Sequence, residues 1–92
     1  MLRTGPQWAR DFEAGRRLRN LRTAAGLSKA EVTRRMRAAG FTNWHRPTLG
    51  RLEGGERHFQ LAEVEELARI LDVGPREITT GSTWRQRRKE TP

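Results

Sequence analysis

The segment LAEVEELARIL, residues 61–71, constrains the fold more than any other part of the chain. Its apolar residues recur three and four positions apart, at Leu61, Val64, Leu67, Ala68 and Leu71. That spacing places them on one face of an α-helix. Gly74 ends this helix, and Pro75 opens a short further helix that carries Ile78, because a first helical turn tolerates proline. No stretch alternates apolar and polar residues as a half-buried strand would, so we predict an all-α fold.

Start and stop signals define two helices ahead of this segment. The first ends at Gly26, and its apolar face consists of Phe12, Leu18, Leu21 and Ala25. The second covers residues 28–38, with Ser28 as N-cap and Glu31 at the capping-box position. Val32 and Met36 of this helix should face inward.

The sequence NWHRPTLGRLEGG contains helix breakers within a helical pattern. Leu49 and Leu52 have helical spacing, and Pro47 falls in the first turn, where proline removes no intrahelical hydrogen bond. We therefore predict a helix over residues 46–53, the third of five, that directs its leucines to the core and Gly50 outward.

The 92 residues suit one small core, and we divide them into an N-terminal arm (1–10), a helical domain (11–79) and a basic tail (80–92). The formal net charge is +8, from 19 Lys and Arg against 11 Asp and Glu, and nearly all the basic residues are arginine. The planar guanidinium group suits phosphate and guanine. Nucleic acid is therefore the favoured partner, ahead of an anionic membrane; the alternative is a surface that is simply basic and solvated.

Several functional classes lack the residues they need. Without cysteine the chain has no disulfide scaffold and no zinc site built on thiolates. His45 and His58 are the only histidines, and no nucleophile or phosphate-cradling motif occurs, so we expect no enzyme, metal or cofactor. No apolar run approaches the roughly 18 residues of a membrane span, and the N-terminus lacks a signal peptide's apolar core. We expect a cytoplasmic protein without a membrane partner.

Three motifs follow one another in order: GRRLRNLRTAAGLSKAEV, TLGRLEGGER and LAEVEELARILDV. Together they resemble the lambda-repressor-like helix-turn-helix family of phage repressors, Cro proteins and bacterial regulators of the xenobiotic-response-element type. The resemblance covers about residues 12–78 and implies five helices, of which the second and third form the helix-turn-helix. RAAGFTNW replaces the usual short turn, as in some actinobacterial members, so we expect an extended second helix. We expect Phe41 and Trp44 of this insertion in the core rather than stacked on bases.

In this family the third helix lies in the major groove of DNA. The resemblance therefore implies base contacts from the third helix, at Arg46, Pro47, Thr48, Gly50 and Arg51. The two arginines are the strongest candidates, because a guanidinium group can bind O6 and N7 of guanine together. Pro47 and Thr48 suit a thymine methyl group or a phosphate, and Gly50 would let the backbone approach the groove. The alternative is a pair of solvated arginines on an exposed helix face.

The expected phosphate contacts surround this helix, at Ser28, Lys29, Arg34, Arg37, Arg57 and His58. Such contacts set affinity and register but carry little sequence information. The family pattern also pairs Arg22 of the first helix with Glu53 at the end of the third. We expect this partly buried salt bridge to be structural, since Glu53 would repel phosphate if it faced DNA.

We expect a sequence-specific regulator of transcription, a repressor, that binds a palindromic operator in double-stranded DNA as a homodimer. Val73, Ile78 and Trp84 form the expected dimer surface, and a regulatory protein is a possible further partner. One alternative is an antitoxin or phage anti-regulator that acts mainly through protein–protein contacts. Another is non-specific nucleic-acid binding by the arginine-rich ends of the chain.

Overall fold

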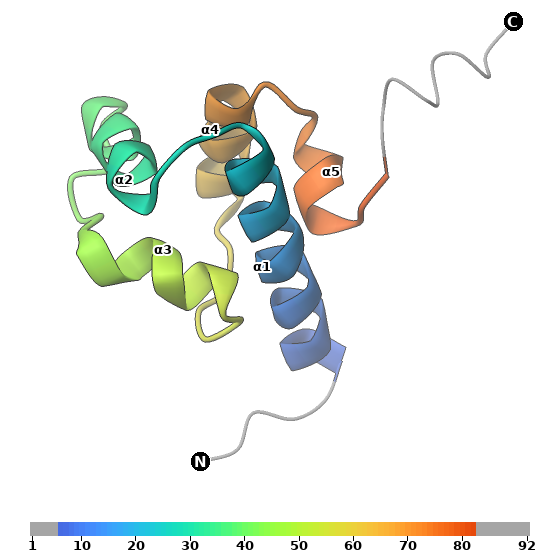
Figure 1. Cartoon of the computed structure of the whole chain (residues 1–92). Coiled ribbons are helices and arrows are strands. Elements are labelled where there is room, and N and C mark those ends of the chain that lie inside the picture. The colour runs from blue at the N-terminus through green and yellow to red at the C-terminus, as the bar shows by residue number, and fades with distance from the viewer. Residues whose placement is uncertain (1–5, 83–92) are drawn as a thin grey trace, which may run out of the picture.

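The computed structural model describes residues 6–82 and contains five α-helices. Their bounds are Pro6–Ala24 (α1), Lys29–Ala38 (α2), Arg46–Glu53 (α3), Leu61–Leu71 (α4) and Pro75–Thr79 (α5). The described residues include no strand, so the predicted all-α fold with five helices is confirmed. α3 and α5 pack on opposite sides of α1, and α4 contacts both α2 and α5 (Figure 1).

The core is one cluster to which every helix contributes. Its buried members are Leu18, Val32, Met36, Trp44, Leu49, Leu52, Val64, Leu67, Ala68, Leu71 and Ile78. Trp44 is completely buried, and Phe41 packs against the cluster, so the prediction that both aromatic side chains are structural is confirmed. α2 ends at Ala38, at the predicted bound, and residues 39–45 form the turn that leads into α3, so the expectation that this insertion extends the second helix is wrong.

α1 differs from its prediction in both its start and its buried face. It begins at Pro6, so residues 6–10, which were assigned to the arm, are helical. Phe12 is 40% exposed and Ala25 lies beyond the helix end, so the predicted apolar face is wrong at these two positions, whereas Leu18 is buried and Leu21 packs against the core. The buried positions of α1 are Asp11, Ala14, Gly15, Leu18 and Arg22.

Gly15 explains this orientation of α1. A Cβ atom at Gly15 would lie 2.2 Å from the carbonyl oxygen of Leu52 and 2.7 Å from that of Glu53. The backbone of α1 therefore approaches the end of α3 more closely than any side chain would allow. This contact turns the side of α1 that carries Gly15 toward α3 and leaves Phe12 at its edge.

Gly55 fixes the other side of this contact. It has a left-handed backbone, with φ of 75°, and a Cβ atom there would lie 2.8 Å from Cα of Phe12. The N–H of Gly55 donates to the carbonyl of Leu52, and that of Glu56 to the carbonyl of Arg51. These are the two hydrogen bonds of a Schellman motif, which ends α3 directly against α1.

α5 is docked onto α1 within the same chain. Ile78 is completely buried, and Val73 packs against the core. The guanidinium group of Arg17 donates to the carbonyls of Ile78 and Thr79, at 2.8 and 2.7 Å. The predicted dimer surface is therefore wrong at Ile78, because this side chain already completes the core of its own domain. Trp84, the third residue of that surface, lies outside the described residues.

Candidate functional site

The exposed face of α3 is a continuous strip. Thr48, Leu49, Leu52 and Glu53 are buried and occupy one side of the helix. At about 100° per residue, the other four positions of α3 and its C-cap Gly54 follow one another around the opposite side, in the order Arg46, Gly50, Gly54, Pro47 and Arg51. We call these five residues the α3 outer face. Its two edges carry arginine, and its middle carries two glycines and a proline.

Both arginines of the α3 outer face are available for intermolecular contacts. Arg46 and Arg51 are exposed, and neither has an ion pair or side-chain hydrogen bond with another described residue. Five positions of helix separate them by about 7.5 Å along the axis. This is about two base-pair steps of duplex DNA, whose rise is about 3.4 Å. Their spacing therefore suits contacts to separate bases.

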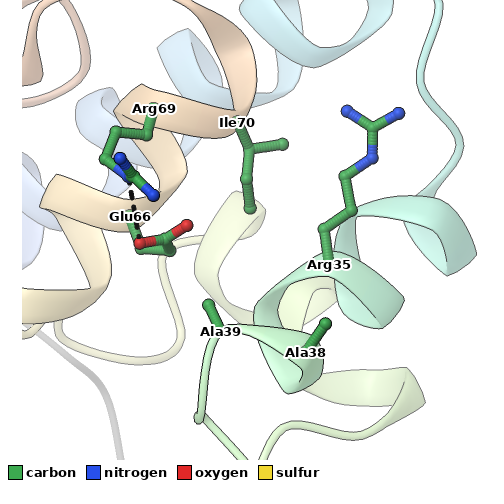
Figure 2. Close-up of a pocket in the computed structure, with 6 residues that line it drawn as sticks. All are labelled: Arg35, Ala38, Ala39, Glu66, Arg69 and Ile70. Carbon is green, nitrogen blue, oxygen red and sulfur yellow. Dashed lines mark ion pairs between the residues drawn. The ribbon is translucent and has the colours of Figure 1, made fainter.

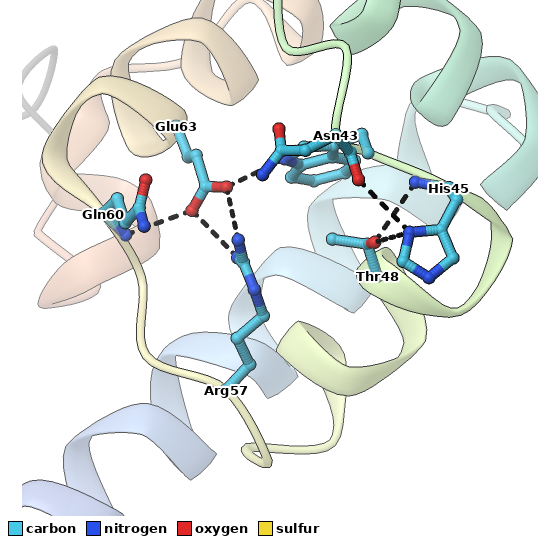
Figure 3. Close-up of polar contacts among 7 residues, drawn as sticks. Asn43, His45, Thr48, Arg57, Gln60 and Glu63 are labelled. Carbon is cyan, nitrogen blue, oxygen red and sulfur yellow. Dashed lines mark hydrogen bonds and ion pairs between the residues drawn. The ribbon is translucent and has the colours of Figure 1, made fainter.

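The first turn of α3 is fixed by its own side chains. The hydroxyl of Thr48 accepts the backbone N–H of His45 at 3.2 Å and lies 3.1 Å from Nδ1 of that histidine, which lies 3.2 Å from the carbonyl of Asn43 (Figure 3). Thr48 is only 5% exposed. Its side chain thus caps the helix and faces inward, so the expected base or phosphate contact from Thr48 is not supported. Pro47, beside it, is exposed.

A buried carboxylate, Glu63, anchors the turn before α3. Glu63 is 1% exposed and accepts the indole N–H of Trp44 at 2.8 Å and the backbone N–H of Gln60 at 3.2 Å. The guanidinium group of Arg57 reaches both carboxylate oxygens, at 2.9 and 2.8 Å (Figure 3). Arg57 therefore compensates a buried charge instead of presenting its own to DNA, and the expected phosphate contact from Arg57 is not supported.

The pKa of Glu63 is held below its ordinary value of 4.5 by these partners. Burial alone would raise this pKa, because a charged carboxylate loses its hydration. The hydrogen bonds from Arg57, Trp44 and Gln60 and the positive charge of Arg57 more than offset that effect. The role of Glu63 in joining three segments is a finding of the structure.

Two more of the expected phosphate contacts are also internal. Arg37 donates to the carbonyls of Thr42 and Trp44, at 2.7 Å each, and so holds the turn that leads into α3. Nδ1 of His58 is paired with the carboxylate of Asp11 on α1. Neither arrangement supports a phosphate contact, because each side chain is already committed to positioning a loop.

The start of α2 keeps its expected exposure. Ser28 caps α2 by accepting the N–H of Glu31 at 3.0 Å, and Lys29 is exposed. The carboxylate of Glu31 binds Arg34 and Arg35, whose hydrogen bonds lower its pKa to about 2. Glu31 therefore does not complete the predicted capping box. Arg34 remains exposed, although its charge is shared with Glu31.

The predicted salt bridge between Arg22 and Glu53 is present. Nε and one terminal nitrogen of Arg22 donate to the two carboxylate oxygens, at 2.6 and 3.2 Å. The other terminal nitrogen donates to the carbonyl of Leu27 at 2.9 Å. Both side chains are buried, so this pair fixes α3 against α1 and the turn before α2.

Two depressions flank the helix-turn-helix segment. The smaller, about 220 Å³, lies beside α3 and is lined by Arg19, Lys29, Gly50, Glu53 and Gly54. The larger, about 540 Å³, lies between α2 and α4 and is lined by Arg35, Ala38, Ala39, Glu66, Arg69 and Ile70 (Figure 2). Gly50 therefore lies on the outward side of α3, as predicted, and it also lines the smaller depression.

Two residues that line the smaller depression, Arg19 and Gly54, were not predicted from the sequence. Arg19 precedes the predicted salt-bridge residue Arg22 by one helical turn, so the pattern that identified Arg22 also places Arg19 near α3. Gly54 was interpreted only as a helix stop, and its place on the α3 outer face follows from the helical period.

Within the described part of the chain, no group of three or more His, Asp or Glu side chains could hold a metal ion. None of the described helices is long and apolar enough to cross a membrane. The family model of a helix-turn-helix domain matches residues 13–80. No curated protein and no solved structure matches the chain.

Proposed function

The chain belongs to the helix-turn-helix domain family, and we propose that it is a sequence-specific regulator of transcription that binds double-stranded DNA through the α3 outer face. One observation carries this proposal. Arg46 and Arg51 are exposed on α3, without partners among the described residues, and they flank a strip whose middle residues are small. Most other arginines near α3, such as Arg22, Arg37 and Arg57, make internal hydrogen bonds. Arg46 and Arg51 differ from them because their guanidinium groups are free to bind another molecule.

The proposed base contacts follow from the chemistry of the α3 outer face. Each of Arg46 and Arg51 can donate two hydrogen bonds to guanine, and one such contact discriminates against other bases by about 1–3 kcal/mol. Pro47 lies between them on the exposed side and offers an apolar contact to a thymine methyl group. Ser28, Lys29 and Arg34 at the start of α2 would contact phosphates, so binding should weaken as salt concentration rises.

We further propose that the protein acts in the cytoplasm as a homodimer and as a repressor on a palindromic operator. A single short helix makes few base contacts, and a second half-site raises affinity and specificity together. Half-sites one helical turn apart, about 34 Å, would present the same groove to two protomers. A dimer bound there would exclude other proteins from the same DNA.

A second candidate function is protein binding, which the larger depression favours. Ala38, Ala39 and Ile70 give it an apolar surface, and Arg35, Glu66 and Arg69 add charge (Figure 2). In the first case, a regulatory protein binds in this depression while α3 binds DNA. In the second case, the depression is the principal binding site of the protein. The second case describes an antitoxin or anti-regulator, and in that case Arg46 and Arg51 would be dispensable.

The deciding experiment selects binding sites from random duplex DNA with the native protein, Arg46→Ala and Arg51→Ala. We expect the native protein to enrich one motif, and each variant to lose preference at a different position of that motif. Arg76→Ala is the matched control, since Arg76 is exposed on α5, away from α3. If no motif emerges, or if both variants keep the native motif, the proposed base contacts are wrong. Sedimentation of the protein with the selected DNA then gives the number of protomers bound.

A further inference from the structure

The larger depression, between α2 and α4, has an apolar floor with an arginine on each side. Ala38 and Ala39 are exposed, and Ile70 is half-buried. These three side chains lie between Arg35 of α2 and Arg69 of α4 (Figure 2). None of the residues that line the depression belongs to α3. A molecule bound in it would therefore leave the α3 outer face free for DNA.

Both arginines keep an open edge for a further ligand. Nε of Arg35 donates to Glu31 at 2.7 Å, and Nε of Arg69 lies 3.4 Å from the carboxylate of Glu66. The terminal nitrogens of Arg35 and Arg69 donate no hydrogen bond to any residue in the described part of the chain. Their side chains are 42% and 80% exposed. Each guanidinium group can therefore still donate two parallel hydrogen bonds from its terminal nitrogens to one carboxylate.

The acidic side chains beside the depression leave a net positive charge. Glu31 is shared between Arg34 and Arg35, and Glu66 is the only acidic residue that lines the depression. With Arg69, this group has three arginines against two glutamates, which leaves one positive charge uncompensated. The formal net charge of the whole chain is also positive, at +8. Charge complementarity therefore favours an acidic ligand.

The apolar floor favours a protein over nucleic acid as the source of that acidic group. A phosphate backbone could pair with the two arginines but would cover Ile70 and the alanines poorly. An amphipathic peptide offers both carboxylates and an apolar side chain, and its docking in a groove between helices is a recurring mode of recognition. The depression, at about 540 Å³, falls within the range of about 300–1,000 Å³ that is typical of ligand sites, so it has room for more than one side chain.

We propose that the larger depression binds an acidic amphipathic segment of a partner protein. An apolar side chain of this segment packs on Ile70 and the two alanines, between two carboxylates that bind Arg35 and Arg69. The inference rests on the second candidate function, and it names the chemistry of the partner. The segment binds the protein with or without DNA, because the depression and the α3 outer face share no residue.

The test selects ligands from a library of random linear peptides. The full chain is the target, and Ala38→Leu, which fills the apolar floor, is used to remove peptides that bind elsewhere. The retained peptides should carry an apolar residue between two acidic ones. Arg35→Ala and Arg69→Ala should each weaken binding of a retained peptide about tenfold. Alanine at one acidic position of the peptide should leave Arg35→Ala without further effect, and alanine at the other should do the same for Arg69→Ala.

Ala24→Leu is the matched control for Ala38→Leu. Ala24 is exposed and is the last residue of α1, as Ala38 is the last residue of α2, and it does not line the depression. This variant should bind the retained peptides as the native protein does. The absence of retained peptides, retained peptides without acidic residues, or native peptide affinity in both Arg35→Ala and Arg69→Ala would overturn the proposal.

DNA binding by the same variants separates this site from the α3 outer face. Arg35→Ala, Arg69→Ala and Ala38→Leu should keep the native DNA motif and affinity, and a retained peptide should form a ternary complex with the protein and the selected DNA. If the two arginine variants lose DNA affinity but keep peptide affinity, the arginines bind phosphate and the proposal is overturned. If the native protein selects no DNA motif but retains acidic peptides, the base contacts are wrong and the peptide site stands.

Discussion

The indole Nε1 of Trp44 donates a 2.8 Å hydrogen bond to the buried carboxylate of Glu63, and this bond joins the turn before α3 to the first turn of α4. The turn spans residues 39–45, and a turn of this length needs contacts with the rest of the domain to hold one conformation. Trp44 supplies both apolar burial and a hydrogen-bond donor, and Arg57 neutralises the acceptor. The position of α3 therefore depends on a polar contact inside the core.

We expect Glu63→Leu to destabilise the domain by about 2–4 kcal/mol, because the substitution leaves the indole N–H of Trp44 and the guanidinium group of Arg57 without their acceptor. Urea unfolding followed by circular dichroism measures the change. Glu65→Leu is the control on the same helix: Glu65 is exposed, and its substitution should change stability by less than about 0.5 kcal/mol. Equal losses in the two variants would show that the Glu63 contacts contribute nothing specific.

The lowered pKa of Glu63 predicts a dependence of stability on pH. A carboxyl group with a lower pKa in the folded state stabilises the fold fully above its unfolded value, here 4.5, and that contribution disappears as pH falls through the folded pKa. Between neutral pH and pH 4.5 the contribution should be constant. The free energy of unfolding of the native protein should therefore fall more steeply below pH 4.5 than that of Glu63→Gln. Parallel curves would contradict this, and Glu31, whose pKa is also lowered, is present in both proteins.

Gly15→Ala should destabilise the domain by about 1–3 kcal/mol, although alanine favours helix more than glycine does. The added Cβ would lie 2.2 Å from the carbonyl oxygen of Leu52, so α1 and α3 must separate. Gly50→Ala is the matched control, because its Cβ would meet only Nζ of Lys29 at 3.9 Å. That variant should be unchanged or more stable by up to about 1 kcal/mol. Thermal unfolding compares the two, and a stabilised Gly15→Ala would refute the close contact.

The helices were predictable because their signals are local. The bounds of α3, the N-cap Ser28 and the short α5 follow from spacing, capping residues and the tolerance of proline in a first turn. The burial of Trp44 was also predictable, since a large aromatic residue in a long turn has few other places to pack. The fold class therefore required no information about contacts between helices.

The parts of the site that were predicted wrongly depend on contacts between residues that are far apart in the sequence. Arg57 was predicted to contact phosphate, but its guanidinium group is paired with Glu63. Thr48 was predicted to contact DNA, but its hydroxyl caps α3. Phe12 has the right period for a core residue, yet the approach of Gly15 to α3 turns it to the edge of the interface. A local sequence pattern does not show which charged side chains have an ion-pair partner far away in the sequence. Those ion pairs determine which arginines remain free to bind DNA.

The salt bridge between Arg22 and Glu53 offers the sharpest test of how α3 is held. Arg22→Met leaves a buried carboxylate without its partner, and Glu53→Leu leaves a buried guanidinium group, so each should cost about 3–5 kcal/mol. The double variant removes both charges and should be more stable than either single variant, since apolar residues of similar size can replace a buried ion pair. Urea unfolding of the four proteins gives the coupling energy. A double variant as unstable as the sum of the single losses would show that the two residues act independently.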